Sequence, residues 1–584
     1  MKSGTLFLMM RYFEATARAF PHLFMPAPLS EDGSLDKAQI RSDVFAGITV
    51  AVVLIPQAMA YALLLGLSPI NGLYAAFFGV LVASLWGSSR QMVTGPVGVM
   101  SLLSLSALAP YAGEGPERMI TLAAALAFMV GVSQLVLGVF RLGFVMRLVP
   151  HSVLIGFSTG AALVIALTQI PAFLGVSVGA HEFVFQTMHA LVLAAADAKP
   201  ATLIVGLASL AGVVLLRRLG KAFPGALIVM ILATAASWLL GLESSGVSVI
   251  GTIPQALPSF HAIGFGDILA LGPQAAVLAL IGFMESFAIA KALASEKKQK
   301  IDVDKELVGQ GLANATAGLF QGYPVSGSFS ISALNVSAGA RTALSGVTTA
   351  ICIVAAIFIL TPLLYFLPKA TLAAIILSAV VRLVSLERIR HLYAVAPADG
   401  IVAAITGACA VLVKPDDAVF LGVIVALLVF IWSVMQVEVV ELGMHRAWHT
   451  LRSLAHNEDI DIYPHVLIIR VDRAFVYANA ERIVEETYAR IAEREARTHE
   501  KLRALVMNCS GVNGIDGSGL EGFEEIADTC AARGMQVALL NVKHGVRDAL
   551  KRARLDSRID CLHNYDELDS FRRRFAGDEI TPTR

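Results

Sequence analysis

Charged residues are scarce in this sequence, and the few that are present cancel one another. Asp, Glu, Lys and Arg make up 15% of the 584 residues, with 45 of each sign, whereas about 25% is usual in soluble domains. A chain without net positive charge has no global field to attract nucleic acid, so no nucleic-acid partner is expected. Hydrophobic residues make up 56%, and mean hydropathy is +0.70. Water is therefore not the main solvent of this protein.

Cysteine is also rare, and enzyme motifs are missing. The sequence has neither a CxxC pair nor a histidine near a cysteine at metal-ligand spacing; its five cysteines are Cys352, Cys409, Cys509, Cys530 and Cys561. A disulfide framework and a zinc site are therefore not expected. The sequence also lacks a Ser/His/Asp arrangement and a nucleotide motif, so it predicts no enzyme activity and no resident metal or cofactor.

Long apolar blocks fill the chain from residue 44 to residue 440. Blocks of this length, broken by Gly, Pro and short charged clusters, are typical of helices that cross a bilayer. About fourteen segments are expected, near residues 44–66, 69–86, 92–109, 120–140, 148–174, 201–216, 223–241, 270–294, 306–320, 326–339, 343–361, 369–381, 398–413 and 417–436. The sequence thus predicts an α-helical polytopic membrane protein in contact with the lipid bilayer.

Basic residues indicate how these segments are oriented. If the N-terminus lies inside, one set of alternate loops holds fifteen Lys and Arg residues and the other set holds four. Because Lys and Arg concentrate in cytoplasmic loops, both termini are expected in the cytoplasm and the protein in the inner (plasma) membrane of the cell. Residues 1–43 begin with an apolar run too short for a signal peptide, and we expect them to form a cytoplasmic lead-in.

The sequence changes character after residue 440. Residues 441–461 are predicted to be a polar linker, and short apolar runs then alternate with charged amphipathic stretches. HVLIIRV, ALVMNCS and QVALLNV are predicted to be buried strands, and residues 478–496 and 519–534 to be helices. A small soluble α/β domain is therefore expected over residues 462–576, followed by a tail over residues 577–584.

Three motifs resemble the sulfate permease (SulP) family. Residues 56–74 read PQAMAYALLLGLSPINGLY and residues 323–346 read YPVSGSFSISALNVSAGARTALSG; both are similar to signature segments of SulP transporters. Residues 506–523, VMNCSGVNGIDGSGLEGF, resemble the core of a STAS domain, the module usually fused to these transporters. The resemblance implies a seven-plus-seven inverted repeat, here about residues 44–242 and 268–436, with core and gate domains. It also implies a small anion bound between two half-helices, and a homodimer.

Two interruptions of the apolar sequence predict an anion site within the membrane. They lie at residues 94–96 and 323–328, in comparable positions of the two halves, and each is typical of a helix N-terminus. Free backbone N–H groups and about half a positive charge per helix dipole bind an anion without a basic side chain. Two kinks at helix contacts are the alternative. The candidate residues are Thr94, Gly95, Pro96, Val97, Ser326, Gly327, Ser328, Phe329, Ser330 and Ile331.

Polar side chains beside these breaks complete the candidate site. Gln57 and Tyr61 lie four residues apart and therefore on one helix face, which the family pattern turns toward the substrate. A contact between helices explains Gln57 equally well. Ser328 and Ser330 offer hydroxyl groups, unless these bond back to their own helix.

Glu285 is the one acidic residue expected well inside an apolar span. A charge at the centre of a bilayer costs about 2.5–3.5 kcal/mol on insertion scales, so an intramembrane carboxyl is a functional candidate. The SulP pattern also has Glu at this point. We expect Glu285 to couple anion uptake to proton entry; a neutral Glu bonded to a neighbouring helix is the alternative. Sodium is the second candidate coupling ion.

Ile331 departs from the family pattern, in which many members carry Arg in a Phe-Ser-Arg-Ser stretch. Without that charge, two helix dipoles together supply about one positive charge, which suits a monovalent anion and undercompensates a dianion unless a proton accompanies it. Sulfate remains the leading substrate for secondary active transport. Bicarbonate, chloride or a proton-coupled dicarboxylate are rival substrates, and a channel-like anion conductor or a membrane-anchored STAS signalling protein are rival functions.

The turn over residues 511–519 is glycine-rich, yet it lacks the Gly-Lys-Ser/Thr of a phosphate-binding loop. In free-standing STAS proteins the matching turn carries a phosphorylated Ser, and Ser518 occupies that place here. Ser518 is therefore a candidate regulatory phosphosite, with a plain helix N-cap as the alternative.

Overall fold

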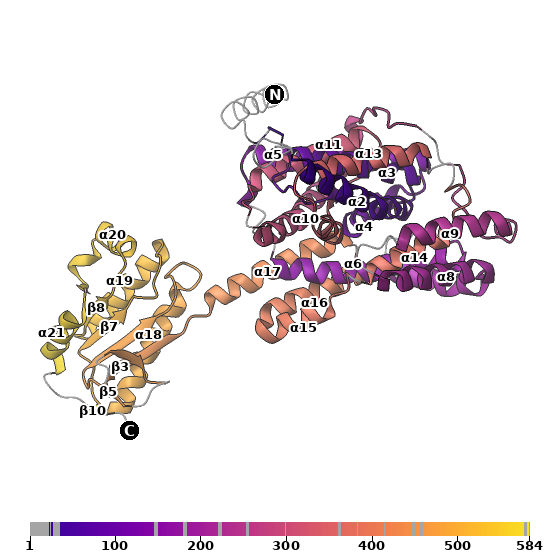
Figure 1. Cartoon of the computed structure of the whole chain (residues 1–584). Helices are drawn as coiled ribbons and strands as arrows, with labels where there is room; N and C mark the ends of the chain where they lie inside the picture. The colour runs from indigo at the N-terminus through magenta and orange to yellow at the C-terminus, as the bar shows by residue number, and fades with distance from the viewer. Residues whose placement is uncertain are drawn as a thin grey trace. The chain divides into compact units, whose positions relative to one another are not determined.

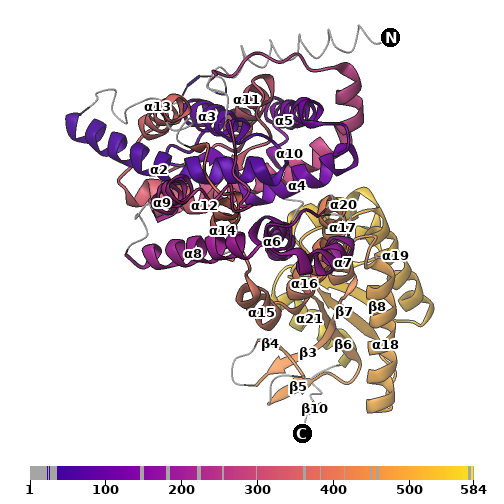
Figure 2. The ribbon, with the colours of Figure 1, turned by 90° about the vertical axis from the view of Figure 1, so that its right-hand side faces the viewer.

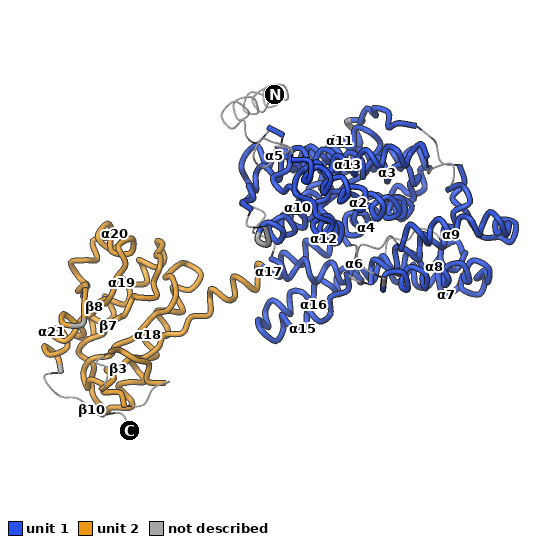
Figure 3. Tube along the Cα trace, viewed as in Figure 1, with its two compact units in different colours: residues 1–426 blue, residues 427–584 orange. Residues whose placement is uncertain are grey.

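The computed structural model in Figure 1 describes most of the chain. The described residues are 23, 25–26, 36–144, 150–178, 184–219, 225–252, 256–297, 299–359, 364–381, 383–413, 415–446, 450–455, 459–576 and 581–582. Most of the expected lead-in 1–43 lies outside these ranges. The chain divides into two compact units, residues 1–426 and 427–584 (Figure 3).

The first unit is built from helices, as the apolar blocks predict. The helices are α2 (Lys37–Leu64), α3 (Pro69–Trp86), α4 (Gly98–Leu108), α5 (Pro116–Val139), α6 (His151–Leu174), α7 (Val184–Ala194), α8 (Pro200–Leu216), α9 (Gly225–Leu240), α10 (Phe265–Lys297), α11 (Val303–Leu319), α12 (Phe329–Ser337), α13 (Leu344–Ile359), α14 (Lys369–Val380), α15 (Leu386–Val395), α16 (Pro397–Leu412) and α17 (Pro415–Met435). Each expected segment coincides with one helix. The sequence did not predict α7 and α15, because α7 has only 11 residues and α15 is a charged, amphipathic helix with no buried residue.

Not every helix is long enough to cross a bilayer. Among the described residues, six helices are long and apolar enough to span it, or seven if α7 and α8, bent by 114°, count as one span. Helix α4 has 11 residues and α12 has 9, so they extend about 16 and 14 Å, half the thickness of a hydrocarbon core of about 30 Å. Both begin a few residues later than predicted. They are half-helices of the kind that the Gly and Pro interruptions indicate.

The helices pack into two bundles that combine both halves of the chain. In Figures 1 and 2, α2, α3, α4, α5, α10, α11 and α13 lie on one side of the first unit, and α6, α8, α14 and α16 lie on the other. Helix α5 packs on α11, α11 on α3 and α13 on α2 in the first bundle, whereas α16 packs on α6 and α14 on α8 in the second. The half-helices α4 and α12 occupy the third place of their repeats. This arrangement confirms the inverted repeat with core and gate domains.

The second unit is a sheet covered by helices, as predicted. Its strands are β3 (Val439–His445), β4 (Leu451–Ser453), β5 (Ile460–Ile462), β6 (Val466–Val471), β7 (Ala504–Asn508), β8 (Gln536–Leu540), β9 (Asp560–Leu562) and β10 (Thr581–Pro582). They follow the order β10-β5-β3-β6-β7-β8-β9, in which β6 to β9 are parallel. The helices are α18 (Ala480–Thr498), α19 (Gly517–Ala532), α20 (His544–Arg552) and α21 (Tyr565–Ala576).

The predicted linker 441–461 and tail 577–584 both contribute strands to this sheet. Strand β3 pairs with β6 and β4, and β10 pairs with β5. Glu441, the one acidic residue of β3, is compatible with the sheet because helix α18 supplies basic partners. It accepts hydrogen bonds from Arg494 and, at 2.7 and 2.8 Å, from Arg497. Hydropathy does not reveal this pairing, since the arginines lie more than fifty residues away.

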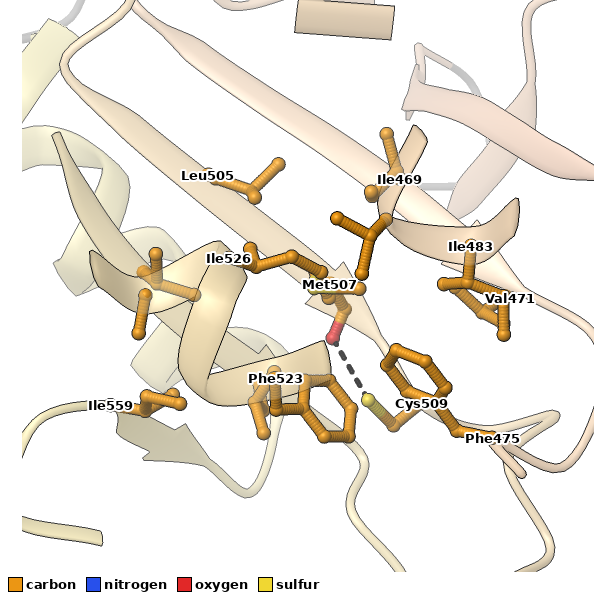
Figure 4. Close-up of a cluster of buried hydrophobic side chains, with 14 of the residues drawn as sticks. Ile469, Val471, Phe475, Ile483, Leu505, Met507, Cys509, Phe523, Ile526 and Ile559 are labelled. Atoms are coloured by element: carbon orange, nitrogen blue, oxygen red, sulfur yellow. Dashed lines mark hydrogen bonds between the residues drawn. The ribbon is translucent and has the colours of Figure 1, made fainter. Parts of the chain in front are cut away.

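Two buried apolar clusters hold the second unit together, one on each face of the sheet. The larger cluster includes Phe475 and Phe523, whose ring centroids are 4.7 Å apart, and the sulfur of Cys509 (Figure 4). The smaller cluster joins strand residues to Leu568 and Phe571 of α21. The parallel strands are therefore covered on both faces, as expected for an α/β sheet.

Cys509 provides a pH-dependent test of this core. Its side chain is fully buried, its sulfur donates to Met507 O at 3.5 Å, and burial raises its pKa to about 12. Since the thiolate is the reactive form, we expect iodoacetamide to leave Cys509 unmodified between about pH 7 and 9 in the native protein. Labelling should appear only after denaturation in SDS, as measured by peptide mass spectrometry. Equal native labelling of Cys509 and the half-buried Cys561 would contradict the core described here.

Candidate functional site

The two predicted interruptions meet in the structure. Residues Thr94–Gly95 form strand β1 and Ser326–Gly327 form strand β2, and the two pair antiparallel, with Thr94 opposite Gly327. Helix α4 starts three residues after β1, and α12 starts two residues after β2. Because the strands are antiparallel, the half-helices leave the pair in opposite directions. Both helix N-termini therefore lie beside the same short strand pair.

Neither half-helix carries a side-chain cap at its N-terminus. The N-cap residues are Val97 and Ser328, and neither makes a capping hydrogen bond. The Val97 side chain has no oxygen that could accept a hydrogen bond. Ser328 is of a favoured capping type, but its hydroxyl does not cap α12. The first N–H groups of a helix need acceptors from outside it, and each helix dipole adds about half a positive charge. Two such ends can bind an anion.

Gln57 and Tyr61 of helix α2 reach the two half-helices. A Cβ built on Gly98, the first residue of α4, would lie 3.4 Å from the Tyr61 hydroxyl oxygen. Gln57, one turn earlier, lines a cavity of about 90 Å³ together with Ser330 and Ile331 of α12. Gln57 and Tyr61 thus lie on one face of α2, as their spacing predicts, and this face is near the start of α4 and the first turn of α12.

Several other candidate residues face the protein interior. Thr94 is fully buried, and its hydroxyl oxygen accepts from Gln310 Nε2 at 2.8 Å. Ser326 donates to Gly282 O at 2.7 Å, and Gly327 N donates to Ser286 Oγ at 2.8 Å, both in α10. These groups hold the strand pair against α10 and α11. Because the strand side chains are used in these bonds, the helix ends are the groups that remain to contact a ligand.

The remaining candidates differ in exposure. Val97 and Ile331 are buried, whereas Phe329 is 59% exposed and Ser330 is also exposed. Gly95 and Pro96 are buried beside the strand pair, where a Cβ on Gly95 would lie 3.4 Å from Leu54 Cδ1. Two side chains of the first turn of α12 are therefore exposed on the membrane unit.

Sequence reasoning missed a polar stripe on helix α11 that supports the strand pair. Glu306, Gln310 and Asn314 follow one another at intervals of four residues and are all fully buried. Glu306 accepts from the backbone N–H groups of Ser88 and Ser89 at 2.7 and 2.9 Å. Gln310 Nε2 bridges Glu306 Oε1, at 3.0 Å, to Thr94. The i, i+4, i+8 spacing of polar residues in an apolar helix was the available signal.

Asn314 fixes the other half of the strand pair. Its side-chain oxygen accepts from Val325 N at 2.8 Å, and its amide donates to Val325 O at 3.0 Å and to Gln134 Oε1 at 3.1 Å. Gln134 of α5 in turn donates to Ala279 O of α10 at 3.2 Å. Helix α11 therefore holds the segment before each half-helix through a separate side chain, Gln310 for the first and Asn314 for the second.

Asp43 is a second buried carboxyl group that sequence reasoning assigned only to a span end. It is fully buried in α2 and accepts from Arg341 N at 2.6 Å and from Thr342 Oγ1 at 2.7 Å. These partners lie between α12 and α13. Asp43 thus anchors the segment that follows the second half-helix, as Glu306 anchors the one that precedes the first.

Glu285 lies in α10 next to the helix face that holds β2. Its neighbours Gly282 and Ser286 make the bonds to Ser326 and Gly327. Glu285 is partly exposed as a residue, yet its Oε2 is buried and has no hydrogen-bond partner among the described residues. The described parts of the chain hold no group of three or more His, Cys, Asp and Glu residues that could bind a metal ion.

In the second unit, Ser518 lies in the first turn of α19 and is half-buried. Asp516 occupies the N-cap position, where its side chain accepts from Gly519 N at 3.0 Å and from Tyr477 N at 2.9 Å. The alternative reading of Ser518 as the N-cap is therefore wrong, because Asp516 already provides that acceptor.

Comparison with known proteins shows to which proteins this chain is similar. The profile of the "Sulfate permease family" matches residues 40–406, and that of the "STAS domain" matches residues 457–570. The chain is 33% identical over 525 residues to "Probable sulfate transporter 4.2" of Arabidopsis thaliana, across 88% of this chain and 78% of that one. It is 31% identical over 554 residues to a "Probable sulfate transporter" of Mycobacterium tuberculosis, across 92% and 96% of the two chains.

A solved structure shares the same fold. "The overall structure of SLC26A9" superposes with a TM-score of 0.87, covering 97% of this chain and 96% of that chain at 20% identity. At this level of identity the likeness concerns the fold. It extends over both the helical unit and the α/β unit.

Proposed function

This chain belongs to the sulfate permease family, and on that premise we propose that it is a secondary active transporter that carries sulfate together with a proton. Members of the family are multi-pass membrane transporters of small anions and not enzymes, in agreement with the absence of enzyme motifs. Sulfate is the substrate named for its relatives. Proton coupling is proposed because of Glu285, with sodium as the alternative coupling ion.

The observation that carries this proposal is the pair of uncapped helix ends. Both N-termini lie beside the strand pair β1–β2 within a bundle of apolar helices. A negatively charged solute needs compensation there, because the hydrocarbon offers none. The two dipole ends and the first N–H groups of the two helices can provide it, and Gln57 and Tyr61 of α2 contribute polar groups near these helix starts.

Uptake into proteoliposomes tests the proposal. The purified full-length protein is reconstituted, and accumulation of radiolabelled sulfate, bicarbonate and succinate is followed with and without an inward proton gradient. Saturable uptake of sulfate above its external concentration, stimulated by the gradient, is the expected result. Uptake that never exceeds equilibrium and does not saturate would instead indicate a channel-like conductor.

A monovalent anion such as bicarbonate or chloride is the second candidate, and Ile331 favours it. Two dipole ends supply about one positive charge, and the residue at which many family members carry Arg is an apolar, buried Ile here. Competition by these anions for sulfate uptake distinguishes the two candidates, since a site matched to one charge would prefer them over sulfate.

Replacement of Glu285 by Gln tests proton coupling. Gln has the shape of the protonated carboxyl group but cannot release a proton, so we expect uptake to fall to the rate measured without a proton gradient. The matched control is Glu243→Gln, which removes an exposed carboxylate from the turn after α9 and should retain full stimulation. Unchanged uptake and unchanged pH dependence in the Glu285→Gln protein would contradict the proposed coupling.

The proposal also covers location and assembly. We place the protein in the plasma membrane with both termini in the cytoplasm, supported by the distribution of Lys and Arg, and as a homodimer, which the family resemblance implies. The STAS domain then serves folding, trafficking or dimer contacts, and phosphorylation of Ser518 regulates it. Uptake retained after removal of the chain beyond residue 450 would assign transport to the membrane unit and contradict a primarily signalling role.

A further inference from the structure

The cavity beside Gln57 contains a basic residue that the sequence did not connect with the site. It is bounded by α2, by the first turn of α12, by the end of α14 and by the ends of α8 and α9 that face each other. Among the described residues that line it, Arg217 is the only one with a charge, and Gln57, Ser330 and Ser378 are the polar ones. One positive charge therefore faces the part of α12 in which Ile331 lies.

Arg217 is held in this position by helix ends. It caps the C-terminus of α8, and its Nη1 donates to Ser378 O, near the C-terminus of α14, at 3.3 Å. Helix C-termini attract cations, so both contacts favour a guanidinium here. The bond to Ser378 uses one of the five N–H donors of the group. Arg217 is half-buried, and the other donors belong to a side chain that lines the cavity.

We propose that Arg217 is the specificity-determining residue that adds a second positive charge to the anion site and so selects a divalent oxyanion such as sulfate. The two helix ends beside the strand pair contribute about one charge, and the guanidinium, which lines the cavity on the α12 side, adds one more. Arginine is also suited to tetrahedral and planar oxyanions, because its N–H groups bind two oxygens at once. The charge missing at Ile331 is thus supplied from the second bundle, at the end of α8.

The dimensions of the cavity agree with this role. Its volume of about 90 Å³ exceeds the 10–15 Å³ or so that one water molecule requires on the same measure, so it has room for an anion of a few heavy atoms. The inference rests on the proposed function, since it concerns the site through which the substrate passes. It favours sulfate, the first candidate substrate, over the monovalent anions that Ile331 by itself would favour.

Neutralising Arg217 in the full-length protein is the test. In proteoliposomes, Arg217→Gln should raise the KM for sulfate by at least about tenfold, the effect of losing a charge-assisted hydrogen bond. Chloride uptake should change much less, and Arg217→Lys should retain most of the preference for sulfate. The matched control is Arg218→Gln, which removes the same charge from the next residue; Arg218 is exposed and does not line the cavity. Equal sulfate KM values for the wild type, Arg217→Gln and Arg218→Gln would overturn the inference.

Moving the charge provides a second, independent readout. In the double variant Arg217→Gln/Ile331→Arg the positive charge returns to the same cavity from α12, so sulfate uptake should recover. A double variant no better than Arg217→Gln, in a protein that elutes as a single folded species, would show that charge in this cavity is not what selects sulfate. If the wild type transports neither anion, the proposed function fails. Stabilisation of the detergent-solubilised variants by sulfate against thermal unfolding then still tests Arg217.

Discussion

Replacement of Glu306 by Ala is expected to destabilise the membrane unit by about 3 kcal/mol or more and to abolish anion uptake. The Glu306 carboxylate is fully buried and accepts three hydrogen bonds, from Ser88 N, Ser89 N and Gln310 Nε2. Alanine leaves the donors of Ser89 and Gln310 buried, and that of Ser88 half-buried, without this acceptor, and each such donor costs about 1–3 kcal/mol. Gln310 would also lose the acceptor that orients its amide toward Thr94.

The loss of uptake follows from the position of these bonds. Residues 88 and 89 lead into strand β1, and Thr94 lies in it, so the strand pair would lose its support on one side. Glu306→Gln keeps one acceptor oxygen and should have an intermediate effect. Thermal unfolding in detergent and uptake in proteoliposomes measure both quantities.

Glu117→Ala is the matched control for this experiment. Glu117, like Glu306, lies in the first turn of its helix, but it is exposed. Both substitutions remove a carboxylate that is favourable near a helix N-terminus, an effect of about 0.3–1 kcal/mol, and only Glu306→Ala also removes a buried acceptor. Equal unfolding temperatures for the two variants would contradict the role of Glu306 described here.

Replacement of Gly131 by Val should also destabilise the protein, by about 3 kcal/mol, through packing alone. A Cβ on Gly131 of α5 would lie 2.6 Å from Gly311 O and 2.7 Å from Ala315 Cα of α11. Atoms this close must separate, and the nearby atoms belong to the backbone of α11, which cannot rotate away as a side chain would. Because α11 also carries Gln310 and Asn314, its displacement should move both half-helix starts and reduce uptake.

Gly266→Val separates this effect from helix propensity. Gly266 lies in α10 and has no atom within 4 Å of the position of an added Cβ. In a helix Val is slightly more favourable than Gly, so the control should be neutral or slightly stabilising. If Gly131→Val unfolds at the same temperature as Gly266→Val in detergent, α5 and α11 do not pack as closely as the structure shows.

In each repeat, the turn before the half-helix is held by hydrogen bonds from the other repeat, but the bonding groups differ. In the second repeat Glu306, near the start of α11, binds the backbone that follows α3. In the first repeat Asn71, near the start of α3, donates to Gln321 O, in the turn that follows α11, at 2.8 Å. The second helix of each repeat therefore anchors the turn that leads to the half-helix of the other. A carboxylate accepts from two N–H groups on one side, and an amide donates to a carbonyl on the other.

The positions of the helices could be predicted because their signal is local. Long apolar blocks such as residues 151–174 must form helices in lipid, where every backbone group needs a partner within the segment. The breaks before α4 and α12 could be predicted for the same reason, since Gly, Pro and Ser cluster at these two places in the sequence and favour helix starts. Strand β3 could not, because its charge is compatible with the sheet only beside α18.

The amino-acid sequence by itself thus determines which segments enter the membrane, where two helices are interrupted and where the soluble domain begins. The reason is that hydropathy and helix interruption depend on residues close in the sequence. It does not reveal that Thr94 is bound to Gln310, 216 positions away, nor that Arg217 lines the same cavity as Ile331. These contacts depend on how helices that are distant in the sequence pack together. The periodicity of one helix carries no information about which helices it packs against. The charge of the anion site is therefore a property of the packed bundles.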